Sequence, residues 1–235
     1  MKFLVFQHIP NEHPGWMAKA AKEKGVQLDT IAFWKPYKIP SLSSYKGLII
    51  MGGPMDVFQG KDLYPSKEDE LRIIKEALGE IPVLGVCLGS QLLAYALGAE
   101  VHPNIVGGKL LKEIGYYDID LTKEGRESPL FQGFSDKIKV LQWHGSAFEL
   151  PQGAKLLATS PDCHNQAFSY MNAYGLLFHM EFTPEMVEKQ IQVDKEWIHK
   201  DFDLDEEKLL AEARQKADLM RKQSEKLFSN FLSLL

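Results

Sequence analysis

The first half of the chain alternates segments typical of strands with segments typical of amphipathic helices. Residues 81–87, "IPVLGVC", form an uninterrupted apolar run, which is typical of a strand buried on both faces of a parallel sheet. Parallel neighbours need crossover connections, which are usually helices. The order therefore predicts an α/β fold with three layers, in which helices cover both faces of a mostly parallel central sheet. The expected strands cover residues 2–9, 26–34, 45–53 and 81–87, and the expected helices cover residues 15–25, 66–79 and 89–98.

The ends of these expected helices carry recognisable signals. Gly25, Gly79 and Gly98 follow the last residues of the helical patterns, where glycine commonly ends a helix. Ser66 is followed three residues later by Asp69, which fits a capping box. We therefore expect the second helix to begin with a side-chain cap at Ser66.

The second half of the chain is richer in strands and poorer in helices. Strand-like segments follow one another directly, so we expect antiparallel strands to be added to the sheet. The last stretch, from Asp205 to Leu235, is helical, and we expect a domain of residues 1–200 with a helical extension, residues 201–235, packed on it. A dimer or partner surface is the alternative use of that helix. Its apolar stripe comprises Leu209, Ala213, Ala217, Met220, Leu227 and Phe231.

Charge and composition exclude several classes of protein. The formal net charge is -5, with 45% hydrophobic and 25% charged residues, which is ordinary for a soluble globular chain. Nothing indicates the basic face of a nucleic-acid-binding protein. The apolar run in residues 1–10 is too short for a signal peptide or a membrane span. We therefore expect a cytoplasmic protein that contacts neither nucleic acid nor membrane.

Cysteine usage points in the same direction. The chain holds two cysteines, Cys87 and Cys163, and lacks both a CxxC pair and an HExxH pattern. A secreted disulfide scaffold usually holds more cysteines, and a structural zinc site usually shows closer ligand spacing. We therefore expect neither disulfides nor a metal site.

Cys87 lies where the apolar strand meets the following helix. The stretch Gly85-Val86-Cys87-Leu88-Gly89 has the form GxCxG, the cysteine counterpart of the GxSxG elbow of α/β-hydrolases. Small residues on both sides let the strand and helix backbones approach, and the helix N-terminus favours a thiolate. A lone cysteine is more often a small buried apolar residue, but this pattern favours a nucleophile.

A cysteine nucleophile needs a base and a group that orients the base. His179 and Glu181 lie two residues apart at the end of an apolar run that Pro184 interrupts. In an extended chain, such residues point to the same side about 7 Å apart. The glutamate is then close enough to hold the imidazole tautomer, as the aspartate does in a serine protease triad. The alternative is an ordinary strand end at the surface.

An acyl-transfer site also needs donors for the oxyanion. Backbone N–H groups are preorganised for this purpose. The N–H of Leu88, directly after the nucleophile, is one candidate. Gly52 and Gly53 directly follow a buried strand and can approach a substrate closely, although an ordinary tight turn would also use them.

Three segments together resemble the class I glutamine amidotransferases, the triad family of glutaminase domains. "MGGPMD" at residues 51–56 resembles the oxyanion strand of the family, and "PVLGVCLGSQLLAYALGAEV" at residues 82–101 resembles its nucleophile elbow. "GLLFHMEFTPE" at residues 175–185 resembles its terminal histidine–glutamate motif. Residues 107–122 and 141–160 add likeness to the stand-alone branch called GMP synthase-like. The resemblance implies a flavodoxin-like fold and spans most of the first 185 residues.

The resemblance also implies roles for single residues. Cys87 would be the nucleophile, His179 the base and Glu181 its partner, with oxyanion N–H groups from Gly53 and Leu88. Residues that would hold the glutamine substrate are Gln91, Trp143, His144 and Gly145.

The sequence departs from the family pattern at three positions. Met180 stands where proline is usual, which would loosen the geometry of His179 and Glu181. Ser146 stands where "HGD" is common, which weakens inference about what lies beyond the γ-glutamyl group. Ser90 replaces a histidine or alanine without evident consequence.

The implied chemistry is cleavage of the glutamine side-chain amide through a γ-glutamyl thioester, without metal or organic cofactor. The segment after the motif is too short to form an acceptor domain, so either the ammonia goes to a separate synthetase or the activity is simple hydrolysis. One alternative is a γ-glutamyl peptidase that uses the same triad on a γ-glutamyl compound. Another is a non-catalytic module that has kept the fold.

Overall fold

The chain folds around one mixed sheet. The computed structural model describes residues 1–200 and 202–235. Within these residues the sheet has nine strands in the order β2-β1-β3-β4-β13-β12-β11-β8-β9. It is parallel from β2 to β13 and antiparallel from β13 to β9. The strands are β1 (Lys2–Gln7), β2 (Gln27–Ala32), β3 (Leu48–Ile50), β4 (Val83–Val86), β8 (Glu113–Leu121), β9 (Lys137–His144), β11 (Lys155–Thr159), β12 (Ala167–Tyr170) and β13 (Ala173–Leu176).

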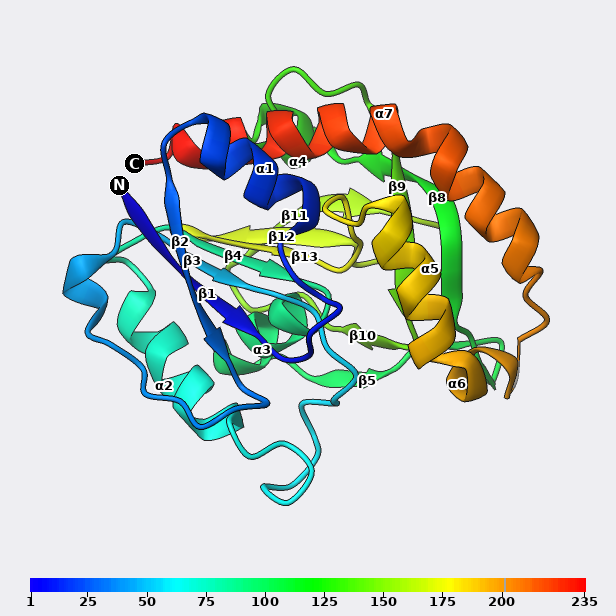
Figure 1. Cartoon of the computed structure of the whole chain (residues 1–235), viewed down its shortest axis with the longest axis horizontal. Coiled ribbons are helices and arrows are strands. Elements are labelled where there is room, and N and C mark those ends of the chain that lie inside the picture. Colours follow the sequence, from blue (N-terminus) through cyan, green and yellow to red (C-terminus); the bar gives the residue numbers. More distant parts are fainter. Residues whose placement is uncertain (201) are drawn as a thin grey trace.

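Helices cover both faces of the parallel half, which confirms the three-layer α/β fold. Phe3 and Val5 of β1 pack in the core beneath α1 and α7, whereas Leu4 and Phe6 pack in the core formed with α2 and α3. Figure 1 shows these two pairs of helices on opposite sides of the strands. Successive side chains of a strand point to opposite faces, so the four central residues of β1, Phe3 to Phe6, are all apolar. The helices are α1 (Gly15–Glu23), α2 (Lys67–Ala77), α3 (Leu88–Ala96) and α7 (Glu206–Leu232).

The antiparallel half has a core of its own. Leu141 and Trp143 of β9 pack with Met186 of α5 (Pro184–Val193) and with Leu209 of α7. The short helices α4 (Lys123–Glu127) and α6 (Lys195–His199) lie in the same half of the chain. α7 therefore runs across both halves, as Figure 1 shows.

The expected stripe of α7 is buried except at Ala217, which is partly exposed. Asp201, the first residue of the expected extension, lies outside the described residues. Among the described helices, none combines the length and the apolar character that crossing a membrane requires.

Several strands of the second half are shorter than the strand-like segments of the sequence that contain them. The run at residues 173–183 is extended only to Leu176. The stretch at 109–122 divides into β7 (Lys109–Leu110) and β8, and the stretch at 138–150 divides into β9 and β10 (Ser146–Phe148). β10 pairs with β5 (Val101–Pro103) and β6 (Ile105–Val106) pairs with β7, both outside the main sheet. Two 3₁₀ turns, Leu42–Ser44 and Pro129–Phe131, complete the elements.

The helix ends differ in how well the sequence predicted them. Gly25, Gly79 and Gly98 all have positive φ, at 67°, 83° and 85°, as their placement predicted. The prediction of a capping box at Ser66 is wrong. Ser66 has a helical backbone and makes no side-chain cap, because its hydroxyl donates instead to the Glu70 carboxylate at 2.7 Å. A buried carboxylate needs that donor more than the helix end does.

Candidate active site

Cys87 occupies a sharp turn between β4 and α3. Its φ of 50° and ψ of -110° lie outside the regions that non-glycine residues favour, and α3 begins at the next residue. A Cβ atom on Gly85 would overlap the backbone of Gly89, and one on Gly89 would overlap the carbonyl of Ile50. The two glycines therefore allow the close approach of strand, turn and helix that holds this strained backbone.

His179 and Glu181 form a buried pair near Cys87. His179 Nδ1 and Glu181 Oε1 are 2.8 Å apart, and both side chains are 1% exposed. The pair follows the end of β13, and the backbone of His179 exchanges two hydrogen bonds with Leu141 of β9. Met180 does not loosen the pair, because its N–H donates to Glu181 Oε2 at 3.0 Å. A proline has no N–H and would not make this contact.

Burial and mutual contact set the protonation of Cys87 and His179. Burial raises the pKa of the Cys87 thiol, although a hydrogen bond and the charge of His179 act to lower it. Burial alone would lower the pKa of His179, but Glu181 and the contact with Cys87 raise it well above its ordinary value. The two groups therefore influence each other's protonation, and Glu181 favours a proton on the imidazole.

The glycine loop after β3 lies against both groups. A Cβ on Gly52 would overlap Glu12 Oε2 and lie 3.2 Å from His179 Cε1, so a side chain there would have to displace the Glu12 carboxylate. A Cβ on Gly53 would lie 2.9 Å from Leu88 Cδ2. The Leu88 N–H itself reaches the Cys87 sulfur. The structure thus brings Gly52, Gly53 and Leu88 together around Cys87.

A cavity of about 320 Å³ opens over the Cys87 sulfur. Its wall carries three carboxylates, from Glu12, Asp56 and Asp194, together with the ammonium of Lys112. All four residues expected to hold a substrate line it: Gln91, Trp143, His144 and Gly145. This volume lies at the small end of ligand pockets, which suits a metabolite of amino-acid size.

Comparison with known proteins decides the family. Residues 15–197 match the sequence model of the family described as "Glutamine amidotransferase class-I". The chain belongs to the class I glutamine amidotransferase family. It is 34% identical over 193 residues to the glutamine amidotransferase-like protein YfeJ of Salmonella typhimurium, covering 79% of this chain and 77% of that protein.

Two further relatives extend the comparison. A glutamine amidotransferase structure from Thermotoga maritima superposes with a TM-score of 0.87 at 31% identity, over 99% of this chain and 98% of that chain. The glutamine-hydrolysing GMP synthase of Helicobacter pylori is 29% identical over 175 residues, which cover 74% of this chain but only 31% of that protein. The likeness to GMP synthase therefore concerns about a third of that enzyme.

In this class I glutamine amidotransferase, the expected substrate-holding side chains mostly bind the protein itself. Gln91 Nε2 donates to the Ser146 carbonyl at 3.3 Å, and His144 Nδ1 lies 3.2 Å from the same oxygen. Trp143 Nε1 donates to Asp194 at 2.9 Å. These residues line the cavity, and their role in holding a substrate stays a prediction.

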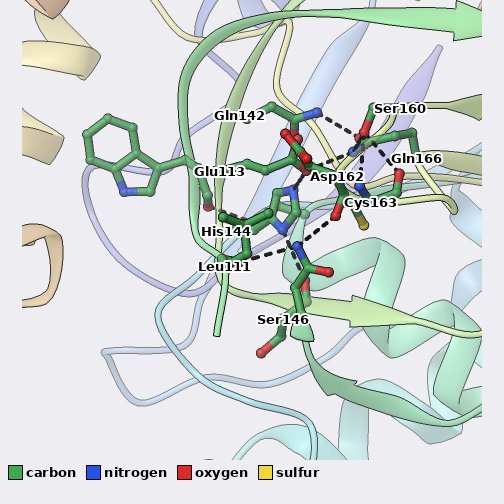
Figure 2. A network of polar contacts seen from close by, with 12 residues as sticks. Leu111, Glu113, Gln142, His144, Ser146, Ser160, Asp162, Cys163 and Gln166 are labelled. Atoms are coloured by element: carbon green, nitrogen blue, oxygen red, sulfur yellow. Dashed lines mark hydrogen bonds and ion pairs between the residues drawn. The ribbon is translucent and has the colours of Figure 1, made fainter. Parts of the chain in front are cut away.

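His144 belongs to a network of polar contacts, which Figure 2 shows. His144 Nε2 lies 3.0 Å from Glu113 Oε2, and that carboxylate also accepts from Gln166 Nε2 at 3.0 Å. The Cys163 thiol is close enough that imidazole, carboxylate and sulfur are within 4.8 Å, a set able to hold a metal ion. Burial and the Glu113 charge raise the pKa of Cys163 to about 12, so this sulfur is a neutral thiol. The Glu113 carboxylate lies beside the imidazole nitrogen that a metal would need.

Sequence reasoning missed two titratable groups behind the glycine loop. Glu12 is buried at the pocket wall, and burial raises its pKa to about 7. His8 forms a fully buried pair with Glu70 at 2.8 Å. His8 and Glu12 directly follow β1, at the carboxyl edge of a parallel sheet. Sites of α/β proteins form at that edge, which was the available signal.

Proposed function

We propose that this class I glutamine amidotransferase hydrolyses the side-chain amide of glutamine through Cys87, His179 and Glu181. The observation that supports it most is the arrangement at the cavity. The Cys87 sulfur is held there on a strained turn, where its thiol donates to the Trp143 carbonyl oxygen at 3.8 Å. It also interacts with the His179 imidazole, which the Glu181 carboxylate orients. These are the parts that nucleophilic catalysis by a thiol requires.

The geometry supports a two-step mechanism. The Cys87 thiolate attacks the amide carbon, and the carbonyl electrons move to oxygen, facing the N–H groups of Gly53 and Leu88. The C–N bond then breaks while the His179 imidazolium protonates the nitrogen, which releases ammonia and leaves a γ-glutamyl thioester. Water attacks the thioester as His179 takes its proton, and the thiolate departs to give glutamate. Glu181 keeps the Nδ1 proton in place throughout.

We further propose that the ammonia serves a separate synthetase subunit. The support is the match to GMP synthase, of which the aligned part is only 31%. The rest of that enzyme lies outside its alignment with this chain.

We also propose a place in the reducing cytoplasm, which the two free cysteines support. The contacts of α7 with α1 and α5 support residues 201–235 as an extension packed on a domain of residues 1–200.

Hydrolysis of γ-glutamyl peptides is the second candidate. Phe58 and Leu110 line the cavity while being 55% and 49% exposed, which leaves apolar surface for a group beyond the glutamyl moiety. Ser146, which stands where "HGD" is common in the family pattern, lies at the wall and donates to Asp56 at 2.9 Å. The same thioester serves both reactions.

A substrate comparison tests these functions. The purified chain is given glutamine, γ-glutamyl dipeptides and glutathione, and ammonia and glutamate are measured. We expect turnover of glutamine, loss of turnover in Cys87→Ala, and retention in Cys163→Ala, the matched control at the second buried cysteine. Turnover of peptides without ammonia release from glutamine selects the second candidate. No turnover and no labelling of Cys87 by a glutamine-analogue electrophile indicate a non-catalytic module.

A further inference from the structure

His8 makes a directional contact with the glycine loop. Its Nδ1 lies 2.9 Å from the carbonyl oxygen of Gly52, and its Nε2 lies 2.8 Å from Glu70 Oε2. A carbonyl oxygen only accepts, so the Nδ1 atom carries the hydrogen whether the ring is neutral or charged. The side chains of His8 and Glu70 are both fully buried, so neither contacts a substrate.

Glu70 is itself fixed on several sides. Its Oε1 accepts from the Ser66 hydroxyl at 2.7 Å, and the Tyr64 hydroxyl lies 3.4 Å from Oε2 and 3.1 Å from His8 Nε2. Burial alone would lower the pKa of His8, but the charge and hydrogen bond of Glu70 raise it overall. The imidazole is therefore held rigidly with its Nδ1–H aimed at the Gly52 carbonyl.

The consequence for the loop follows from peptide geometry. The Gly52 carbonyl and the Gly53 N–H belong to one planar trans peptide, so they point in opposite directions. Gly53 lines the cavity over Cys87, and no hydrogen bond from its N–H is found within the described residues. Two adjacent glycines rotate freely, so local sterics alone do not fix this peptide.

We propose that His8 is a positioning residue that orients the Gly52–Gly53 peptide so that the Gly53 N–H faces the oxyanion formed at Cys87. Glu70 anchors the imidazole for this purpose. The role assigned to the oxyanion rests on the proposed function. The contact itself is independent of which amide or ester is attacked.

The rival explanation is packing alone. Gly53 lies directly on His8, since a Cβ on Gly53 would be 2.8 Å from His8 Cβ. His8→Asn and His8→Leu separate the two explanations because asparagine and leucine have similar size and shape. Asparagine keeps a δ N–H for the Gly52 carbonyl and leucine does not, while both lose the contact with Glu70.

Two reactions of Cys87 provide the readout. Acylation by p-nitrophenyl acetate forms a thioester and expels p-nitrophenolate through a tetrahedral oxyanion. Alkylation by iodoacetamide forms a thioether and expels iodide without any oxyanion. Both consume the same thiolate, so the ratio of their rates cancels changes in thiol ionisation and access. Cys87→Ala supplies the blank for both reagents.

We expect His8→Leu to lower the acylation-to-alkylation ratio at least about tenfold, because a lost oxyanion donor costs about 10²–10³-fold. We expect His8→Asn to stay within about threefold of the wild type. An unchanged ratio in His8→Leu, or equal losses in both variants, overturns the proposal. If His8→Leu does not fold, His8→Ala takes its place as the variant without a donor.

This experiment is separate from the test of the proposed function. Failure of the wild type to cleave glutamine or γ-glutamyl peptides contradicts the function and leaves the ratio measurable. A wild type that cleaves glutamine, with an unchanged ratio in the donor-less variants, contradicts the role of His8 alone.

Discussion

Replacement of Glu181 by glutamine removes one charge from the buried pair and changes little in size. The carboxylate accepts from His179 Nδ1 with one oxygen and from the Met180 N–H with the other. A glutamine has one acceptor oxygen, so its NH₂ group must face one of these two donors. If it faces Nδ1, the imidazole proton moves to Nε2, the nitrogen needed to take a proton from Cys87.

The expected magnitude follows from the distance. With Nδ1 and Oε1 at 2.8 Å, the charge centres of imidazolium and carboxylate lie about 4 Å apart. At an effective dielectric constant of about 20, their attraction is about 4 kcal/mol. Since each 1.36 kcal/mol is tenfold, loss of the charge lowers kcat/KM by about 10³-fold. The change to the wrong tautomer adds to this loss.

The assay is ammonia release from glutamine by Glu181→Gln. Glu185→Gln is the matched control, because Glu185 is an exposed glutamate at the start of α5. We expect the control to equal the wild type. Activity of Glu181→Gln within tenfold of the wild type would refute the assignment of Glu181 as the group that orients and charges His179.

Two further predictions concern Gly89, next to the nucleophile turn, and Glu12 at the pocket wall. Gly89→Ala places a methyl group against the Ile50 carbonyl, so we expect a loss of at least ~2 kcal/mol of stability, seen as a melting temperature about 4–8 °C lower. Gly60→Ala, which meets nothing within 4 Å, should melt like the wild type, and equal melting of both variants contradicts the packing argument. Glu12 ionises near pH 7 and its negative charge raises the pKa of Cys87, so Glu12→Gln should move the pH profile of Cys87 alkylation to lower pH. A profile that stays in place or moves upward would show that Glu12 does not face the thiol electrostatically.

The sequence predicted the layers because the strands and helices carry strong periodic patterns. The apolar residues around β4 are consecutive, and those of β1 pack alternately into two cores. Both patterns can be recognised in the sequence without knowledge of tertiary contacts. The nucleophile turn was also readable, since Gly85 and Gly89 leave a direct trace in the spacing. The end of β13 could not be predicted, because the apolar residues after Leu176 stay buried in a bend that pairs with β9.

The surroundings of the site depended on contacts that a single sequence does not display. His8 reaches Glu70 across 62 positions, and the Ser66 hydroxyl prefers that carboxylate to its own helix end. Gln91 and His144, which are predicted to hold a substrate, both lie within hydrogen-bonding distance of the Ser146 carbonyl. The positions of these side chains could be predicted from the sequence, whereas their hydrogen-bond partners could not.

The pairing of β4 with β13 has a consequence for partly unfolded forms of the protein. The two strands are neighbours in register, with Val86 opposite Leu176, so Cys87 and the segment that carries His179 leave the sheet one strand spacing apart. Their closeness is maintained by central backbone hydrogen bonds, whereas the Gly53 N–H depends on a loop and on one imidazole. Mild denaturant or heat that loosens the loops first would therefore yield a molecule whose thiol still reacts with alkylating agents while its turnover is already lost. In storage or purification, a titratable thiol would then be a poor measure of how much active protein remains.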